Sequence, residues 1–182
     1  MDEIEKSAYL AHLNLVRKEG FRPCMIAILI YNGMVGLCEA KNYHWFEFPQ
    51  GGIEPGEIPS ETIEREIKEE LGEKFFFECN FPAEKYQHLF DVQYKMKVKE
   101  KLLLDSGEYV SPKGKEYMVF AVLLKGNGTP PQINPEDAEA EFKKCFWVKA
   151  DQAKELINKT SHKVKREIAF RAVNEIKKLN LI

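Results

Sequence analysis

Clustered carboxylates between residues 57 and 73 are the side chains of this sequence most able to do chemistry. The segment contains seven glutamates, at positions 57, 61, 64, 66, 69, 70 and 73. At about 100° per residue, a helix here gathers Ile63, Ile67 and Leu71 into one buried stripe. An acidic stripe runs beside it, made of Glu66, Glu69, Glu70 and Glu73. Like charges at this spacing repel, whereas Mg²⁺ and Mn²⁺ favour oxygen ligands, so the stripe is either a solvated acidic face or a cation site.

The residues around these glutamates predict the elements that hold them in place. Residues 45–56, WFEFPQGGIEPG, contain two prolines and three glycines among aromatic residues, which is typical of a structured loop. Pro59 suits the first turn of a helix, where a missing N–H costs nothing, and Gly72 suits the end of one. The sequence therefore predicts a loop followed by a helix that ends at Leu71.

The spacing of glycine, glutamate and arginine across this loop and helix resembles the signature of the Nudix hydrolases. From Gly51, five residues lead to Glu57, and seven more lead to the run REIKEELG at 65–72. The last signature position, usually aliphatic, departs from the pattern because it is Glu73 here. The resemblance implies an α/β (α+β) fold, an α/β/α sandwich around a mixed sheet, in which the signature forms a loop–helix–loop metal site.

The same resemblance implies roles for individual residues. Glu66 and Glu70 would be the main ligands of Mg²⁺ or Mn²⁺, and Glu69 would be a third ligand or would hold a water. The carbonyl of Gly51 could add a ligand, and Glu141 matches a later acidic residue that binds metal or acts as a base. The four glutamates are the expected catalytic residues, because metals neutralise phosphate oxygens and activate water while a carboxylate accepts the proton.

Other residues are expected to brace the site or to contact the substrate. By the resemblance, Glu57 and Arg65 would pair and hold the loop against the helix. Arg22 could contact a substrate phosphate through its planar guanidinium, or could pack at the surface beside Pro23. Gln50, in the loop, is also assigned to substrate binding.

A lysine-rich stretch and several aromatic residues add candidates for RNA binding. The lysines alternate with other residues, as Lys95, Lys97, Lys99 and Lys101. A strand would place them on one face, either as a track for RNA phosphates or as a solvated edge that discourages aggregation. Tyr117, Trp45 and Phe46 could stack a base, although core packing is the alternative for Phe46 and Phe48.

Further segments resemble the bacterial RNA pyrophosphohydrolases and the related dinucleoside polyphosphate hydrolases. They are GFRP at 20–23, FPQGGI at 48–53, AEF at 140–142, FWV at 146–148 and KRE at 165–167. Two features of that subgroup are replaced: an arginine before the aromatic loop, where 39–41 read EAK, and a Trp-Phe pair, where 119–120 read VF. These departures leave the substrate more open than the reaction.

The expected function is metal-dependent removal of pyrophosphate from the 5′ end of triphosphorylated RNA. The alternatives are cleavage of dinucleoside polyphosphates such as diadenosine tetraphosphate, and general removal of nucleoside diphosphate derivatives. A silent module that binds nucleotide or RNA is the non-enzymatic alternative. The intact trio of Glu66, Glu69 and Glu70 argues against it, because a silent module has no need to keep side chains that repel one another.

The composition fits a single globular domain with a terminal extension. The 182 residues are 44% hydrophobic and 31% charged with a net charge of -2, which excludes a disordered chain and a molecule-wide basic field for nucleic acid. The four cysteines, at positions 24, 38, 79 and 145, form no CxxC pair and are expected to be buried thiols. We find no signal peptide or membrane-spanning run, so we expect a cytoplasmic protein without membrane contact, either a monomer or a homodimer.

The remaining sequence predicts where the other elements lie. Residues 1–19 are expected to form a helical extension and 20–182 the Nudix domain. In that first helix Ile4, Ala8, Ala11 and Leu15 recur at helical spacing and predict its buried face. The other expected elements are strands at 24–31, 34–39, 86–103, 116–125 and 145–149, a hairpin turn at 32–33, a loop at 126–138 and a helix at about 163–180.

Overall fold

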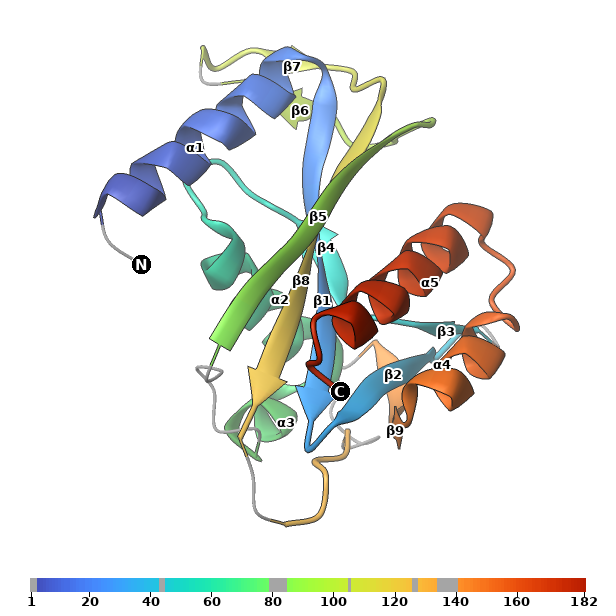
Figure 1. Cartoon of the computed structure of the whole chain (residues 1–182). Coiled ribbons are helices and arrows are strands. Elements are labelled where there is room, and N and C mark those ends of the chain that lie inside the picture. The colour runs from blue at the N-terminus through green and yellow to red at the C-terminus, as the bar shows by residue number, and fades with distance from the viewer. Residues whose placement is uncertain (1–2, 43–44, 79–84, 105, 126–127, 134–140) are drawn as a thin grey trace.

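A seven-stranded mixed sheet forms the centre of the molecule (Figure 1). The computed structural model describes residues 3–42, 45–78, 85–104, 106–125, 128–133 and 141–182. The strands of the sheet are β1 (Phe21–Tyr31), β2 (Met34–Ala40), β3 (Phe46–Glu47), β4 (Gln50–Gly52), β5 (Lys85–Lys95), β8 (Gly114–Leu124) and β9 (Phe142–Val148). Their order is β3-β2-β1-β8-β5, with β4 also pairing with β1 and β9 with β2. The pair β1–β8 is parallel and the other pairs are antiparallel.

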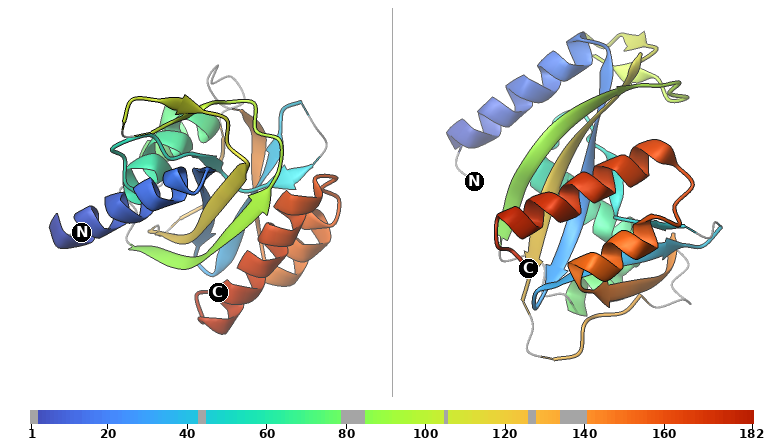
Figure 2. Two further views of the ribbon diagram at one scale, coloured as in Figure 1. Left: turned by 90° about the horizontal axis from the view of Figure 1, so that it is seen from above. Right: turned by 45° about the vertical axis from the view of Figure 1, so that its right-hand side comes forward.

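Helices cover both faces of this sheet (Figures 1 and 2), which confirms the expected α/β/α sandwich. One face carries α1 (Glu3–Lys18), α2 (Pro59–Leu71) and α3 (Glu73–Glu78), and the other carries α4 (Ala150–Ile157) and α5 (Lys163–Lys178). Side chains along β1 alternate between the two layers, as a strand requires. Met25, Ala27 and Leu29 pack in the first core cluster, and Ile26 and Ile28 in the second.

The face of α1 that packs on the domain differs from the one predicted. Ile4 is 81% exposed and Leu15 is 54% exposed, and Ala8 and Ala11 also face solvent. The buried side is centred on Leu13, which is fully enclosed in the first core cluster. A second helical stripe of Tyr9, Leu13 and Val16 competes with the predicted one. The second stripe packs on the domain because burying these larger side chains removes more apolar surface from water than burying two alanines.

The first hairpin forms as predicted, because its turn residues adopt the backbone conformation that the sequence favours. Asn32 and Gly33 have φ values of 48° and 73°, and they join β1 to β2. Positive φ at both central residues gives the turn a twist that matches the flanking strands.

The strand expected over 86–103 is shorter, and this part of the prediction is wrong. β5 ends at Lys95, opposite Gly114, where its partner β8 begins. Beyond that point the sheet offers no continuing neighbour, and the chain instead forms a small separate ladder. That ladder pairs β6 (Leu102–Leu103) with β7 (Tyr109–Val110).

Most other predicted elements are present with shifted ends. β1, β8 and β9 each begin a few residues earlier than expected, and α5 ends at Lys178. The short helices α3 and α4 were not predicted. Part of the loop expected at 126–138 lies outside the described residues.

The described cysteines are buried, as expected. Cys24, Cys38 and Cys145 are free thiols, and Cys79 lies outside the residues that the structure describes. Across the described part of the chain, no helix has both the length and the apolar character needed to span a bilayer.

Candidate active site

The acidic helix α2 packs its apolar stripe on the sheet and turns a row of carboxylates toward strand β4. Ile63, Ile67 and Leu71 are fully buried, as predicted. Glu66 and Glu70 lie one turn apart on the flank beside β4, and they are only 8% and 7% exposed. Burying two carboxylates this way costs free energy unless a cation or hydrogen-bond donors compensate.

Gly51 in β4 leaves the space that the Glu66 carboxylate occupies. A Cβ atom built on Gly51 would lie 1.7 Å from Oε1 of Glu66, much closer than two non-bonded atoms can approach. Glycine is therefore required here by contact rather than by backbone conformation. The same contact brings the backbone of Gly51 next to a buried carboxylate, where the expected carbonyl ligand would have to be.

Glu70 is fixed by the backbone at both of its ends. The backbone N–H of Gln50 donates to Oε2 of Glu70 at 2.9 Å, and the backbone N–H of Glu141 donates to the Glu70 carbonyl at 2.8 Å. Burial raises the pKa of the Glu70 carboxyl well above its usual value, although the Gln50 hydrogen bond opposes this. The charges of Glu66, Glu141 and Glu47 raise that pKa further.

Arg65 and Glu57 face one another across the loop, in the arrangement expected of a brace. Nε of Arg65 donates to Glu57 at 2.8 Å and Nη2 donates to the same carboxylate at 3.1 Å. Nη2 also donates to the carbonyl of Gly52 at 2.9 Å, which ties α2 to β4. The Arg65 guanidinium holds the pKa of the Glu57 carboxyl below its usual value, with further help from the backbone of Glu54 and the hydroxyl of Thr62.

Arg65 also reaches two of the expected metal ligands. Its Nη1 donates to Glu66 at 2.7 Å and to Glu69 at 3.1 Å. Burial raises the pKa of Glu66, and Arg65 opposes that shift. Within the described ranges, no three acidic, histidine or cysteine side chains are assembled as a metal cluster.

The donor set nevertheless fits a hard divalent cation. Glu66, Glu70 and the backbone of Gly51 present oxygen atoms in one small region, and burial leaves the two carboxylates poorly solvated. Carboxylate and carbonyl oxygens are the ligands that Mg²⁺ and Mn²⁺ favour. Glu141 is exposed, and its carboxylate influences the pKa of Glu70, so it borders the same region.

Comparison with known proteins identifies the family. Residues 20–169 match the family model described as the NUDIX domain. The chain belongs to the Nudix family.

Individual relatives of this Nudix family member match smaller parts of it. The RNA pyrophosphohydrolases of Pseudoalteromonas translucida and Yersinia pestis are 40% identical over 60 residues, which is 32% of this chain and 34% of each relative. The match therefore spans about a third of the length of these relatives. A NUDIX hydrolase from Nitrosomonas europaea has a TM-score of 0.54 at 13% identity, covering 85% of this chain and 90% of the other. A solved ADP compounds hydrolase has a TM-score of 0.55 at 15% identity, covering 88% and 76%.

The Nudix site contains an ion pair that the sequence did not reveal. Nζ of Lys165, on α5, donates to the Glu47 carboxylate on β3. Trp45 also donates to Glu47, from Nε1 at 3.3 Å. Glu47 contributes to the raised pKa of Glu70, so the pair lies beside the acidic site. Its partners are 118 residues apart in sequence, and no local pattern links them.

Arg22 lies against the glycine loop of the Nudix site. A Cβ on Gly52 would lie 2.6 Å from Nη2 of Arg22. Nη1 of Arg22 lies 3.2 Å from the carboxylate of Glu100, and Nη2 lies 3.9 Å from that of Glu54. Through Glu100, the lysine-rich segment 95–101 reaches the edge of the site.

The lysines of this segment are exposed, although only Lys95 belongs to β5. From 93 to 99 the odd-numbered residues face solvent and the even-numbered ones are half-buried, so the predicted alternation is present beyond the strand itself. The lysines at 95 and 97, assigned to substrate binding, are therefore free of the core.

Tyr117 has a different position from the one a base-stacking role requires. Its side chain is 4% exposed and lies in the second core cluster, and its ring faces that of Tyr94 with centroids 6.4 Å apart. Burial raises the pKa of its hydroxyl, with Cys24 and Glu47 adding to the shift. This burial leaves no exposed ring face on which a base could stack.

Proposed function

We propose that this Nudix hydrolase cleaves a nucleoside-linked pyrophosphate bond with Mg²⁺, and that its substrate is the 5′ end of triphosphorylated RNA. The observation that carries the hydrolytic part is the pair of buried carboxylates, Glu66 and Glu70, held against the backbone of Gln50 and Gly51. The RNA part is supported by the partial match to RNA pyrophosphohydrolases and by the exposed lysine segment that reaches Arg22.

The residues that would hold the cation are Glu66, Glu69, Glu70 and Glu141, with the carbonyl of Gly51. When bound, Mg²⁺ or Mn²⁺ would supply charge neutralisation on the phosphate oxygens and activation of water. Glu69 and Glu141 are the exposed carboxylates of this set, so either can take the proton of an attacking water. The backbone N–H of Gln50 keeps one oxygen of Glu70 in place while this happens.

Arg65 has two functions in this proposal. It joins the loop to the helix through Glu57 and Gly52, and it holds Glu66 and Glu69 in position through Nη1. The bonds of Arg65 to Glu57 would keep the loop against the helix if Glu66 and Glu69 served as cation ligands.

Arg22 and the lysine segment would bind the phosphates of the RNA. The Arg22 guanidinium lies beside Gly52 and currently bridges two carboxylates that a phosphate could displace. Exposed lysines beyond it would follow the backbone of the nucleotides downstream. A dinucleotide would reach the loop but not the full lysine segment.

We also propose a cytoplasmic location. Cys38 and Cys145 face one another across β2 and β9, with their sulfurs 3.6 Å apart and unbonded. Two opposed free thiols suit a reducing compartment.

A substrate panel tests the proposed function. Purified protein is given triphosphorylated RNA, diadenosine tetraphosphate or ADP-ribose with Mg²⁺, and phosphate and pyrophosphate release are measured. We expect the largest kcat/KM on RNA, and we expect Glu70→Gln to abolish it while the exposed α4 variant Glu155→Gln behaves as wild type. A larger kcat/KM on diadenosine tetraphosphate or ADP-ribose would contradict the proposal that RNA is the substrate. Nucleotide binding without any hydrolysis would indicate a silent module.

A further inference from the structure

A cleft lies beneath α1, on the flank of α2 away from the catalytic carboxylates. Two adjoining cavities of about 350 and 400 Å³ share Glu5, Tyr9 and His88 in their walls. Ser60 and Glu64 of α2 line the second cavity. At about 100° per residue, Glu64 lies on the opposite side of the buried stripe from Glu66 and Glu70, so this cleft is separate from the Nudix site.

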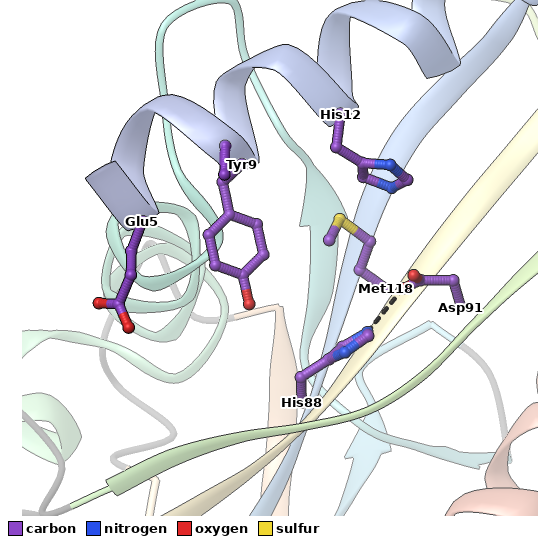
Figure 3. A pocket seen from close by; sticks show the side chains of 7 residues that line it. Glu5, Tyr9, His12, His88, Asp91 and Met118 are labelled. Carbon is purple, nitrogen blue, oxygen red and sulfur yellow. Dashed lines mark hydrogen bonds and ion pairs between the residues drawn. The ribbon is translucent and has the colours of Figure 1, made fainter. Parts of the chain in front are cut away.

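A bulge in β5 turns the side chains that line the cleft toward α1. The register between β5 and β8 shifts between His88 and Phe90. Phe90 packs in the core cluster under α5, whereas His88 and Asp91 both line the cleft. In a regular strand His88 and Asp91 would point to opposite faces, so the bulge brings them together. The imidazole Nε2 lies 2.7 Å from the Asp91 carboxylate. The dashed line in Figure 3 marks this contact.

The floor and walls of the cleft are apolar and aromatic. Met118 is 1% exposed and Phe120 is 4% exposed, and they line the first and second cavity respectively. The rings of His88 and Phe120 have centroids 5.1 Å apart. Figure 3 shows Tyr9 reaching down from α1 toward His88 and Met118. Aromatic faces arranged in this way attract cations as well as apolar groups.

The charged groups around the cleft are acidic. Glu64 accepts a hydrogen bond from the Tyr86 hydroxyl at 3.0 Å in one cavity, Asp91 lies in the other, and Glu5 borders both. No lysine or arginine of the described chain lines either cavity. Burial raises the pKa of the Tyr9 hydroxyl, and the charges of Asp91 and Glu5 raise it further, in keeping with a negative potential at this point.

We propose that this cleft binds a linear organic polyamine. Its ammonium groups would lie near Glu64 in one cavity and Asp91 in the other, against the rings of Tyr9, Tyr86 and His88. Its methylene chain would cover Met118 and Phe120. Ligand sites of roughly 300–1,000 Å³ with apolar walls and a few placed polar groups are the common form of small-molecule site.

An elongated organic cation fits these features better than a metal ion. A hydrated Mg²⁺ gains nothing from a floor of thioether and aromatic groups. Methylene groups that bind there remove apolar surface from water, which is favourable. Residues of α1, α2 and β5 all contribute to the walls, so the bound polyamine joins the N-terminal helix to the helix that carries Glu66 and Glu70.

Calorimetric titration of the full chain with spermidine at physiological salt tests the proposal. We expect saturable binding at one site, weakened roughly tenfold or more by the double variant Glu64→Gln and Asp91→Asn. Replacing spermidine with 1,6-hexanediol, an uncharged chain of similar apolar character, should abolish binding. Glu70→Gln and the exposed α4 variant Glu155→Gln should bind as wild type does.

A second variant covers the case in which the double variant fails to fold. Ala8→Phe fills the first cavity from α1 without changing any charge, and it should weaken spermidine binding by a similar factor while the melting temperature stays near that of wild type. The proposal is overturned if wild type does not bind spermidine, if both cleft variants bind normally, or if only Glu70→Gln loses binding. The last result would assign the polyamine to the acidic Nudix site.

Discussion

Glu70 combines burial, a hydrogen bond from a backbone N–H to its carboxylate and three neighbouring carboxylates, and this combination sets its chemistry. Its pKa is raised by burial and by Glu66, Glu141 and Glu47, and the N–H of Gln50 opposes the shift. An ionised Glu70 is therefore a cost to the metal-free fold and a good ligand for a cation. Glu57 has the reverse environment, because Arg65 stabilises its charge.

The raised pKa of Glu70 predicts a stability change with a definite sign. A carboxyl whose pKa is raised on folding contributes stability that depends on pH. This contribution is fully present at pH values below the pKa of the unfolded state, near 4.5, and it is lost as the pH rises through the pKa of the folded state. Glu70→Gln should therefore raise the melting temperature at pH 7 in the presence of a chelator, and this gain should vanish at about pH 4. Melting curves at both pH values check it, and an equal gain at both would contradict the burial argument.

The lowered pKa of Glu57 predicts the opposite dependence. The contribution of Glu57 to stability is present at pH values above the pKa of the unfolded state. It is lost as the pH falls through the lower pKa of the folded state. Glu57→Gln should lower the free energy of unfolding by about 1–3 kcal/mol at pH 7, because it weakens hydrogen bonds to a charged group. It should reduce turnover less than Glu70→Gln does. Urea titrations at pH 7 and at low pH measure the effect, and a loss of stability that is the same at both would argue against the brace.

At the scale of elements, the site depends on how closely β4 approaches α2. The periodic glutamates and the proline and glycine at its ends made α2 and its buried stripe predictable. The contact between Gly51 and Glu66 could be predicted only from the family resemblance, because nothing else in the sequence indicates that these two residues touch.

Two other elements differ from their predictions for physical reasons. The buried face of α1 was predicted wrongly because two helical stripes compete, and the end of β5 was predicted wrongly because the length of a strand depends on its neighbour. The ion pair between Glu47 and Lys165 joins segments that are distant in sequence, so it could not be predicted without the folded structure.

Gly51→Ala tests the contact between β4 and α2. The new Cβ would overlap the Glu66 carboxylate, which sits at the end of a flexible side chain, so the carboxylate should move while the fold persists. We expect turnover to fall about 100-fold, equivalent to roughly 3 kcal/mol of barrier, with a small change in melting temperature. Gly128→Ala is the matched control, because a Cβ there meets nothing within 4 Å. Normal activity of Gly51→Ala would show that the position of Glu66 is not critical.

At the scale of the whole molecule, charge is distributed unevenly around a net value of -2. The lysine segment beyond β5 is exposed and reaches Arg22 through Glu100, whereas the cleft beneath α1 is lined by acids. A polyanion would therefore approach the Nudix site along the lysines and be repelled from the cleft.

Replacing Lys95, Lys97 and Lys99 with alanine should flatten the salt dependence of RNA binding. Each phosphate contact contributes a slope of about 0.7 in log affinity against log salt for a single strand. Hydrolysis of a dinucleotide should change little, because that substrate lies near the metal site and the loop. An unchanged slope would assign the lysines to solubility, and equal losses on both substrates would indicate damaged folding.

The most direct test of the central claim is the Mg²⁺-dependent release of pyrophosphate from 5′-triphosphorylated RNA by wild type and by Glu70→Gln. The buried carboxylates beside Gly51 predict rapid release by wild type with Mg²⁺, none with a chelator, and a fall of at least about 100-fold in Glu70→Gln. Full activity of Glu70→Gln with Mg²⁺ would contradict the assignment of the site.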